Sequence, residues 1–169
     1  MTVNNAQGGV LDISAGTGLT AGTLRSTTGK LDVDTATGAL KITSATAKTD
    51  LTAQAVSGAL NVSTITAGTA SLKSGADMTL TTVTATGFLS TNSKAAASLG
   101  NLTAGGQLTA DATGAMTVTS AKGTVLDLSA GTGLSAGTLT STTGKIDVDP
   151  HAGGLKNPSA TAKTALTAQ

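Results

Sequence analysis

Residues 10–54 read VLDISAGTGLTAGTLRSTTGKLDVDTATGALKITSATAKTDLTAQ, and residues 125–169 read VLDLSAGTGLSAGTLTSTTGKIDVDPHAGGLKNPSATAKTALTAQ. The second copy follows the first at an offset of 115 residues, without a gap. The segment between the copies has the same Thr, Ala, Gly and Ser texture, so it is not a linker. We infer that a shorter period runs through the whole chain, as expected of a repeat protein.

The shorter period appears when similar seven-residue blocks, such as LKITSAT (40–46) and LNVSTIT (60–66), are aligned. Their starts lie 18 to 21 residues apart, so the long offset corresponds to six short repeats. The third positions of the blocks form a first ladder: Leu24, Ile42, Val62, Leu80, Leu99, Val118, Leu139 and Asn157. A second ladder follows the blocks: Leu11, Leu31, Leu51, Leu72, Leu89, Leu108, Leu126, Ile146 and Leu166.

The local pattern predicts strands joined by corners. In LNVSTIT, Leu60 and Val62 alternate with polar residues, Thr64 breaks step, and Ile65 is apolar again. Alternation places i and i+2 on one face of a strand, so the break predicts a bend between two short strands. Glycines near the block starts predict corners with φ values that other residues avoid. These glycines are Gly38, Gly58, Gly114 and Gly153.

A repeat of about 19 residues cannot bury its own apolar face, whereas stacked repeats can. Successive rungs would pair at about 4.8 Å, with the ladders as interior columns, and right-handed coiling is the expected hand. We therefore predict an all-β protein, a right-handed parallel β-helix (β-solenoid) of about 19 residues per rung and roughly nine rungs. Residues 10–169 would form this single array, as a piece of a longer protein. Residues 1–9 would be a leader or a vector-derived segment.

The composition and charge of the chain argue against nucleic-acid binding, membrane insertion and disorder. The net charge is +1, which gives no field that would favour nucleic acid or an anionic membrane. No apolar stretch approaches the roughly 18 residues of a membrane span, and residues 1–9 lack the features of a secretory signal. Disorder is the competing interpretation of a chain rich in Thr, Ala, Gly and Ser, but the regular aliphatic ladders argue against it.

His151, the only histidine, is the one candidate for acid–base chemistry. With Asp149 and a serine it could form a Ser-His-Asp site. The first copy has Ala36 at the equivalent position, so the repeat does not require the imidazole. A polysaccharide lyase would need clustered carboxylates, Arg or aromatic platforms, and the chain has one Arg and one Phe. We predict no enzyme activity and no catalytic or cofactor-binding residue.

Two aspartate pairs, each on alternate positions of a strand, could hold a cation. They lack the Gly-Gly-x-Gly-x-Asp pattern of calcium-binding solenoids, and hard cations want six or more oxygens. Solvated carboxylates paired with lysines are the favoured interpretation, and we predict no metal site. The residues concerned are Asp32 and Asp34 with Lys30, and Asp147 and Asp149 with Lys145.

The last rung differs from its first copy in a way that bears on strand pairing. Proline cannot donate to a neighbouring strand, so its two prolines predict either the end of the array or a degenerate repeat. Pro150, His151, Asn157 and Pro158 stand where the first copy has Thr35, Ala36, Ile42 and Thr43.

Blocks such as GALKITS (38–44) and GALNVST (58–64), with the period near 19 and the lack of Cys, resemble the shaft repeats of filamentous-haemagglutinin-like exoproteins. These secreted adhesins and contact-dependent-inhibition proteins of Gram-negative bacteria are exported by two-partner secretion. The resemblance implies a right-handed parallel β-helix, secretion or surface display, and adhesion through a receptor on a host or neighbouring cell. Asn157-Pro158 continues with Ser159, so the family's secretion motif is absent, and so is an Arg-Gly-Asp tripeptide.

Two further expectations follow. An array with bare strand edges at its ends is expected to associate end to end. As an alternative function, an outward ladder of Thr-x-Thr triplets could bind ice if the triplets stood in register on one face. The triplets lie at 64–66, 82–86, 117–119 and 138–140. Thr is also simply a good exposed strand residue.

Overall fold

The computed structural model describes residues 1–156 and 159–168, and they form two parallel β-sheets and no helix. Sheet A contains β1 (Thr2–Gly8), β3 (Leu19–Ser26), β5 (Leu40–Thr46), β7 (Leu60–Ala67), β9 (Met78–Ala85), β11 (Ala97–Ala104), β13 (Met116–Gly123), β15 (Leu134–Ser141), β17 (Leu155–Lys156) and β18 (Ser159–Thr161). Sheet B contains β2 (Leu11–Ala15), β4 (Leu31–Thr35), β6 (Asp50–Ala55), β8 (Thr69–Ser74), β10 (Leu89–Ser93), β12 (Leu108–Ala112), β14 (Leu126–Ala130), β16 (Ile146–Pro150) and β19 (Leu166–Ala168).

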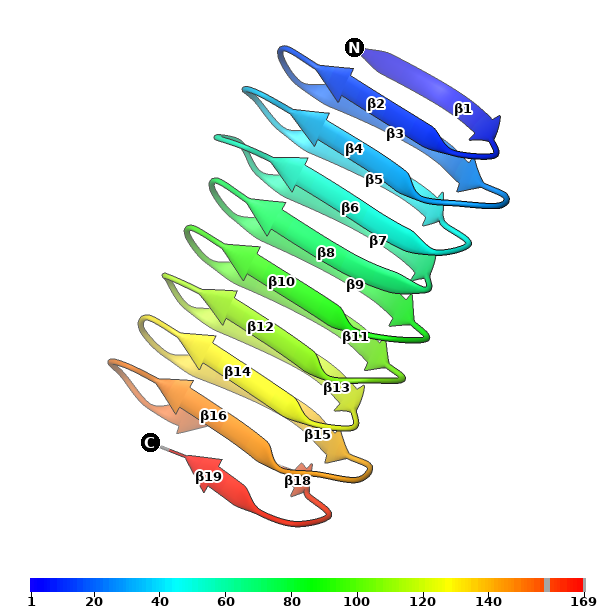
Figure 1. The fold of residues 1–169 in the computed structure, drawn as a ribbon. Helices are drawn as coiled ribbons and strands as arrows, with labels where there is room; N and C mark the ends of the chain where they lie inside the picture. The colour runs from blue at the N-terminus through cyan, green and yellow to red at the C-terminus, as the bar shows by residue number, and fades with distance from the viewer. Residues whose placement is uncertain (157–158, 169) are drawn as a thin grey trace.

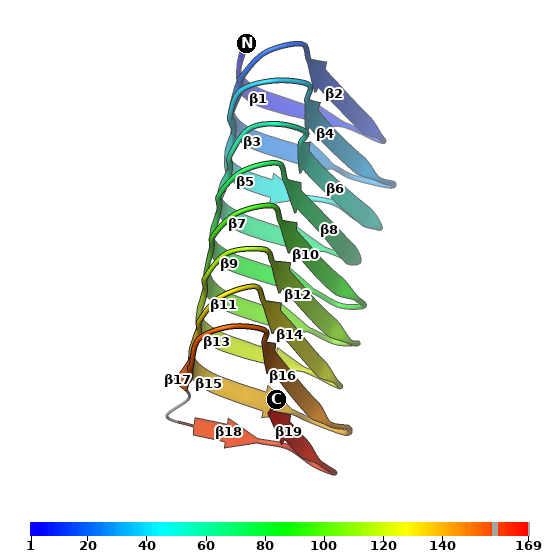
Figure 2. The same ribbon diagram turned by 90° about the vertical axis from the view of Figure 1, so that its left-hand side faces the viewer.

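The chain alternates between the sheets, so that each rung is one sheet A strand, a corner, one sheet B strand and a second corner. Rung 1 holds β1 and β2, rung 8 holds β15 and β16, and rung 9 holds β17, β18 and β19. Figure 1 shows the rungs stacked from the N-terminus to the C-terminus as a right-handed coil, and Figure 2 shows the two sheets as separate layers. The predicted parallel β-solenoid of about nine rungs is confirmed.

The interior consists of aliphatic columns that run along the coil axis. Leu31, Leu51, Leu108 and Leu126 occupy one sheet B column, and each is 0–1% exposed. Because side chains alternate along a strand, the same strands present their polar residues to solvent. The ladder residues of rungs 1–8 therefore face inward as predicted.

Three ladder members nevertheless belong to neighbouring columns. Leu24 pairs with Ala45 and Leu139 with Ala121, so the partner of Ile42 in the first ladder is Ala21 and not Leu24. Leu72 pairs with Ala53 and Thr91, while Ala70 takes the ladder position of Leu51. The reason for this difference is that the inward positions of one strand lie two or three residues apart. In these rungs alanine occupies the inward position that the ladder was expected to use. Alignment by side-chain size then selects the wrong inward residue.

The predicted break in alternation is confirmed as a bend, but it does not divide the strand. Ser63 and Thr64 both face outward in β7, and Ile65 returns to the interior with 0% exposure. The β7–β9 register skips the Ser63 position and continues from Thr64 paired with Thr82. Each long sheet A strand is therefore one continuous strand with a bend in its middle, not two short strands.

Small residues let the chain turn sharply at the ends of the strands. Ser26 is buried, and its hydroxyl donates to the carbonyl oxygens of Gly9 at 2.6 Å and Gly29 at 2.9 Å. Ser93 donates in the same way to Ala76 and Ala96 at 2.9 and 3.0 Å. A buried carbonyl without a donor is costly, so these hydroxyls replace the ladder hydrogen bonds that the corner interrupts.

Two of the four predicted corner glycines adopt the left-handed backbone conformation. Gly38 has φ +76° and Gly153 has φ +87°, values that favour glycine. Gly58 and Gly114 have ordinary φ values, and their corners need glycine for a different reason. A Cβ on Gly58 would lie 1.8 Å from the carbonyl oxygen of Gly38, and one on Gly114 would lie 3.0 Å from the carbonyl carbon of Ala95.

The ends of the chain contribute to the array. Thr2–Gly8 forms β1 and pairs with β3, so the array begins before residue 10. Whether residues 1–9 derive from a leader or a vector stays a prediction. Pro150 closes β16 beside Ala130, and the coil continues past it into rung 9, where Asn157 and Pro158 lie outside the described residues.

Thr91 is the one buried side chain of the described residues whose polar atom has no hydrogen-bond partner. It is 1% exposed and sits in an aliphatic column between Leu72 and Ala110. Valine has nearly the same shape without the hydroxyl. We expect Thr91→Val to raise the free energy of unfolding by about 1 kcal/mol, because it removes an unsatisfied buried group.

A thermal melt followed by circular dichroism tests this expectation, with a rise in Tm of about 2–4 °C. Thr52→Val is the matched control, because Thr52 faces outward on β6. It should change the unfolding free energy by less than about 0.5 kcal/mol. An equal rise in both variants would assign the gain to the strand propensity of valine.

Candidate functional site

The outer face of sheet B carries most of the acidic side chains of the protein. Its strands present two or three outward positions on most rungs, and eight of the nine aspartates occupy them. Lys73 on β8 is the only basic residue at these outward positions in the described chain. The eight residues are Asp12, Asp32, Asp34, Asp50, Asp111, Asp127, Asp147 and Asp149.

The predicted aspartate pairs lie on this face. Asp32 and Asp34 project from β4, and Asp147 and Asp149 from β16, each pair on alternate residues. Among the described residues, no group of three or more His or Asp side chains is arranged to hold a metal ion.

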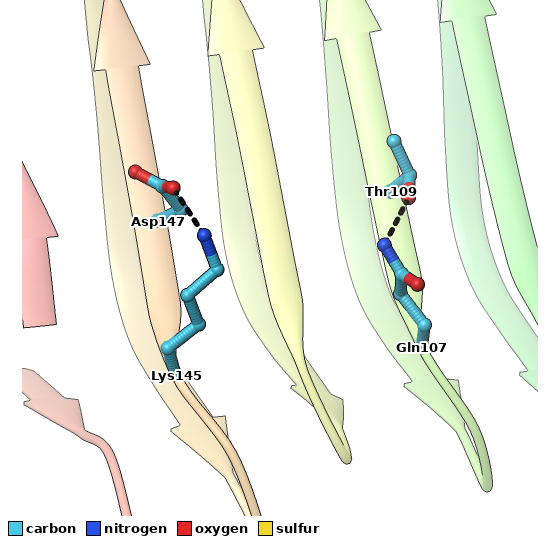
Figure 3. A network of polar contacts seen from close by, with 4 residues as sticks. All are labelled: Gln107, Thr109, Lys145 and Asp147. Atoms are coloured by element: carbon cyan, nitrogen blue, oxygen red, sulfur yellow. Dashed lines mark hydrogen bonds and ion pairs between the residues drawn. The ribbon is translucent and has the colours of Figure 1, made fainter. Parts of the chain in front are cut away.

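The predicted pairing of these carboxylates with lysine is found once. Lys145 donates to Asp147 at 2.8 Å, and this hydrogen bond, followed by the carboxylate charge, raises the pKa of the lysine (Figure 3). Lys30 makes no such ion pair in the part of the chain that the structure describes. Asp34 instead accepts a hydrogen bond from the Ser14 hydroxyl at 2.9 Å.

Aspartates lie close to one another on neighbouring strands at the C-terminal end of the sheet B face. Asp127 pairs in register with Asp147 across β14 and β16. Burial, and secondly the charge of Asp127, raises the pKa of Asp111 on the adjacent β12. The acidic face is therefore a region of repulsion within one molecule, and a positive partner would relieve it.

His151 lies at the edge of the same face. Its Nδ1 is 3.3 Å from Asp149 Oδ2, and the two side chains are 63% and 41% exposed. His151 borders a shallow depression of about 330 Å³ that is also lined by Asp111, Ser93 and Ser129. The Ser93 hydroxyl donates to the corner carbonyls of Ala76 and Ala96. The structure thus brings His151 and Asp149 together, while the Ser93 hydroxyl of the same depression is engaged in the corner.

The outer face of sheet A is rich in threonine. Thr64 pairs with Thr82 and Thr66 with Thr84, so two of the triplets stand in register on adjacent rungs. The triplet at 138–140 shares these two columns, whereas 117–119 lies three residues earlier along its strand. On rung 6, Asn101 and Thr103 continue the columns. The threonine array is therefore more regular than the sequence spacing indicates, but it is incomplete.

Sheet A also differs from sheet B in charge. Its outward positions carry basic residues and, among the described residues, no aspartate. The net charge of +1 gives no sign of this separation, because the basic residues lie singly along the sequence. The separation can be predicted from the sequence when each charged residue is placed relative to the inward-facing ladder residues of its own rung. The basic residues are Arg25, Lys41, Lys122 and Lys156.

The described residues include no helix of the length and hydropathy needed to cross a membrane. Comparisons with protein-family models, curated proteins and solved structures find no match to this chain.

Proposed function

We propose that this chain is a non-catalytic shaft segment of a secreted or surface-displayed bacterial adhesin of the filamentous-haemagglutinin-like type. The observation that carries the proposal is the pair of parallel sheets, whose described strands extend from rung 1 to rung 9 around one aliphatic core. At about 4.8 Å per rung such a coil is a stiff rod about 40 Å long. A stiff rod suits extension of a binding tip from a cell surface, and the blocks GALKITS and GALNVST resemble shaft repeats of that family.

The terminal rungs support assembly of such rods end to end. β2 of rung 1 and β19 of rung 9 each have a neighbour in sheet B on one side only. Leu166 on β19 is 56% exposed, and Leu11 and Ile13 on β2 are half-buried, so both ends present aliphatic surface beside strand edges. Stacking two copies would continue both the hydrogen-bond ladders and the interior columns.

The adhesive role is tested with beads that carry the whole chain, incubated with cultured epithelial cells and with Gram-negative bacteria. We expect saturable binding above that of beads carrying the same chain after heat denaturation. Equal binding by folded and denatured chains would contradict adhesion. Electron micrographs of the soluble chain test the end-to-end contact, which should give rods longer than one array and one array wide.

Ice binding is the second candidate, and the stacked pairs Thr64–Thr82 and Thr66–Thr84 are the observation in its favour. Regularly spaced hydroxyls on a flat face could order water. Ice recrystallisation assays on the intact chain test it, with Thr82→Lys as the variant that interrupts both the spacing and the flatness. Unchanged ice crystal growth in the presence of the unmodified chain would exclude this candidate.

A further inference from the structure

The two outer faces of the solenoid carry opposite charge. Among the described residues, sheet A presents four basic side chains and no acidic one, whereas sheet B presents eight aspartates and Lys73. The net charge of the whole chain, +1, hides this separation. The solenoid therefore has one basic outer face, on sheet A, and one acidic outer face, on sheet B.

The charges on the two faces also occupy similar positions along the axis. Sheet B has its aspartates on rungs 1–3 and 6–8, and sheet A has its basic residues on rungs 2–3, 7 and 9. Between them, rungs 4 and 5 of sheet A present only polar uncharged residues, mostly threonine. On the same two rungs, Lys73 is the only charge on the outer face of sheet B.

The long repeat sets this spacing. Asp32 and Asp34 recur as Asp147 and Asp149, and Lys41 recurs as Lys156, all at the offset of 115 residues. Six rungs at about 4.8 Å place the recurrence about 29 Å further along the axis. Both faces thus repeat their charge with the same axial period.

We propose that copies of this chain associate side by side, with the sheet A face of one copy against the sheet B face of the next and the axes parallel. In axial register this contact brings Lys41 and Lys156 towards Asp32 and Asp147, and it sets the neutral centres of the two faces against each other. The contact is heterologous, so it leaves a free basic face and a free acidic face at the two sides of the row. Further copies can therefore join.

The shape of the faces permits such a contact. Their outward side chains are mostly Thr, Ser, Asn, Asp and Gly, which are short, so two sheets can approach closely. A face about 38 Å long and about 17 Å wide buries about 1,300 Å² in total when two copies meet, which is near the lower limit of stable interfaces. Association should then depend on concentration and on salt. The proposal concerns the chain itself and does not depend on display at a cell surface.

The test is sedimentation velocity of the intact chain over a range of concentrations at about 10 mM and about 1 M salt, where the Debye length is about 30 Å and about 3 Å. We expect a weight-average mass that rises with concentration at low salt and returns to the monomer at high salt. A monomer under both conditions, or association that salt does not weaken, would overturn the proposal.

A matched pair of variants separates the faces from net charge. Lys41→Gln/Lys156→Gln removes two charges from the sheet A face, and Lys48→Gln/Lys163→Gln removes two from the corners. All four lysines are exposed, both pairs are related by 115 residues, and each double variant changes the net charge from +1 to −1. We expect the face variant to associate about ten-fold more weakly and the corner variant to behave like the unmodified chain. Equal weakening in both would refute the face-to-face contact.

Asp12→Asn/Asp127→Asn provides the reciprocal test on sheet B. Both side chains are exposed outward, and neither takes part in an ion pair in the described chain. The same loss of association is expected, and an undiminished mass would overturn the proposal. Electron microscopy distinguishes this contact from end-to-end stacking, because side-by-side rows widen while their axial length stays that of one array.

Discussion

Leu80→Asp is expected to unfold the middle of the array. Leu80 is 2% exposed and faces inward from β9, where Val62 and Leu99 lie above and below it in the same column. A carboxylate at this position would lose its hydration and gain no cationic partner, because its column neighbours are aliphatic. We expect a loss of more than about 4 kcal/mol in the free energy of unfolding, comparable to the whole stability of many domains.

The position of Leu80 in rung 5 increases the effect. In a solenoid each rung contacts only its neighbours, so a disrupted central rung separates rungs 1–4 from rungs 6–9. A circular dichroism melt should show Tm lowered by about 10 °C or more, or no cooperative transition at all. Limited proteolysis should then cut near β9 first.

Thr81→Asp is the matched control for this prediction. Thr81 is the next residue of the same strand, but it is exposed on the outer face of sheet A. The same carboxylate should there cost less than about 1 kcal/mol. A melt of Leu80→Asp that matches that of Thr81→Asp would mean that the inward column is wrongly assigned.

Much of the fold could be predicted because strand alternation alone separates inside from outside. In β4, Leu31 and Val33 are fully buried while Asp32 and Asp34 point to solvent, as their alternation in the sequence predicts. A pattern that repeats every 19 residues or so can bury these leucines and valines only by stacking, and the parallel solenoid follows.

The register could not be predicted at every rung, because side-chain size does not identify a column. Ala21 and Leu24 are both buried in β3, and only the pairing of Ala21 with Ile42 shows which column each occupies. The same ambiguity applies to Ala70 and Leu72 in β8. Alanine and leucine exchange along a column because a larger residue elsewhere in the same rung can fill the space.

The candidate faces were harder to predict than the fold, because charge was considered along the chain. Arg25 and Asp32 are seven residues apart in the sequence, yet they project from opposite sides of the molecule. The corner between β3 and β4 reverses the outward direction. A charge map of a solenoid therefore requires the strand assignment first, and only then does the separation into a basic and an acidic face appear.

Gly58→Ala is expected to destabilise the array although it adds a single methyl group. The corners of successive rungs stack directly, and a Cβ on Gly58 would lie 1.8 Å from the carbonyl oxygen of Gly38 in the rung before. That carbonyl cannot move away freely, because Gly38 is held at φ +76° and its oxygen accepts a hydrogen bond from the buried Thr35 hydroxyl at 3.3 Å. We expect a loss of about 2–4 kcal/mol and a Tm lowered by about 5–15 °C.

Gly16→Ala is the matched control for this prediction, because Gly16 lies in the equivalent corner between β2 and β3. A Cβ there meets no atom within 4 Å, and the backbone of Gly16 is not left-handed. Alanine should then raise the free energy of unfolding by about 0.4–1 kcal/mol, because it restricts the unfolded chain without strain in the folded one. The same substitution is expected to act with opposite sign in two similar corners. If both variants lower Tm equally, the close approach of Gly58 to Gly38 is not what the corner requires, and the loss belongs to the backbone conformation that the corners share.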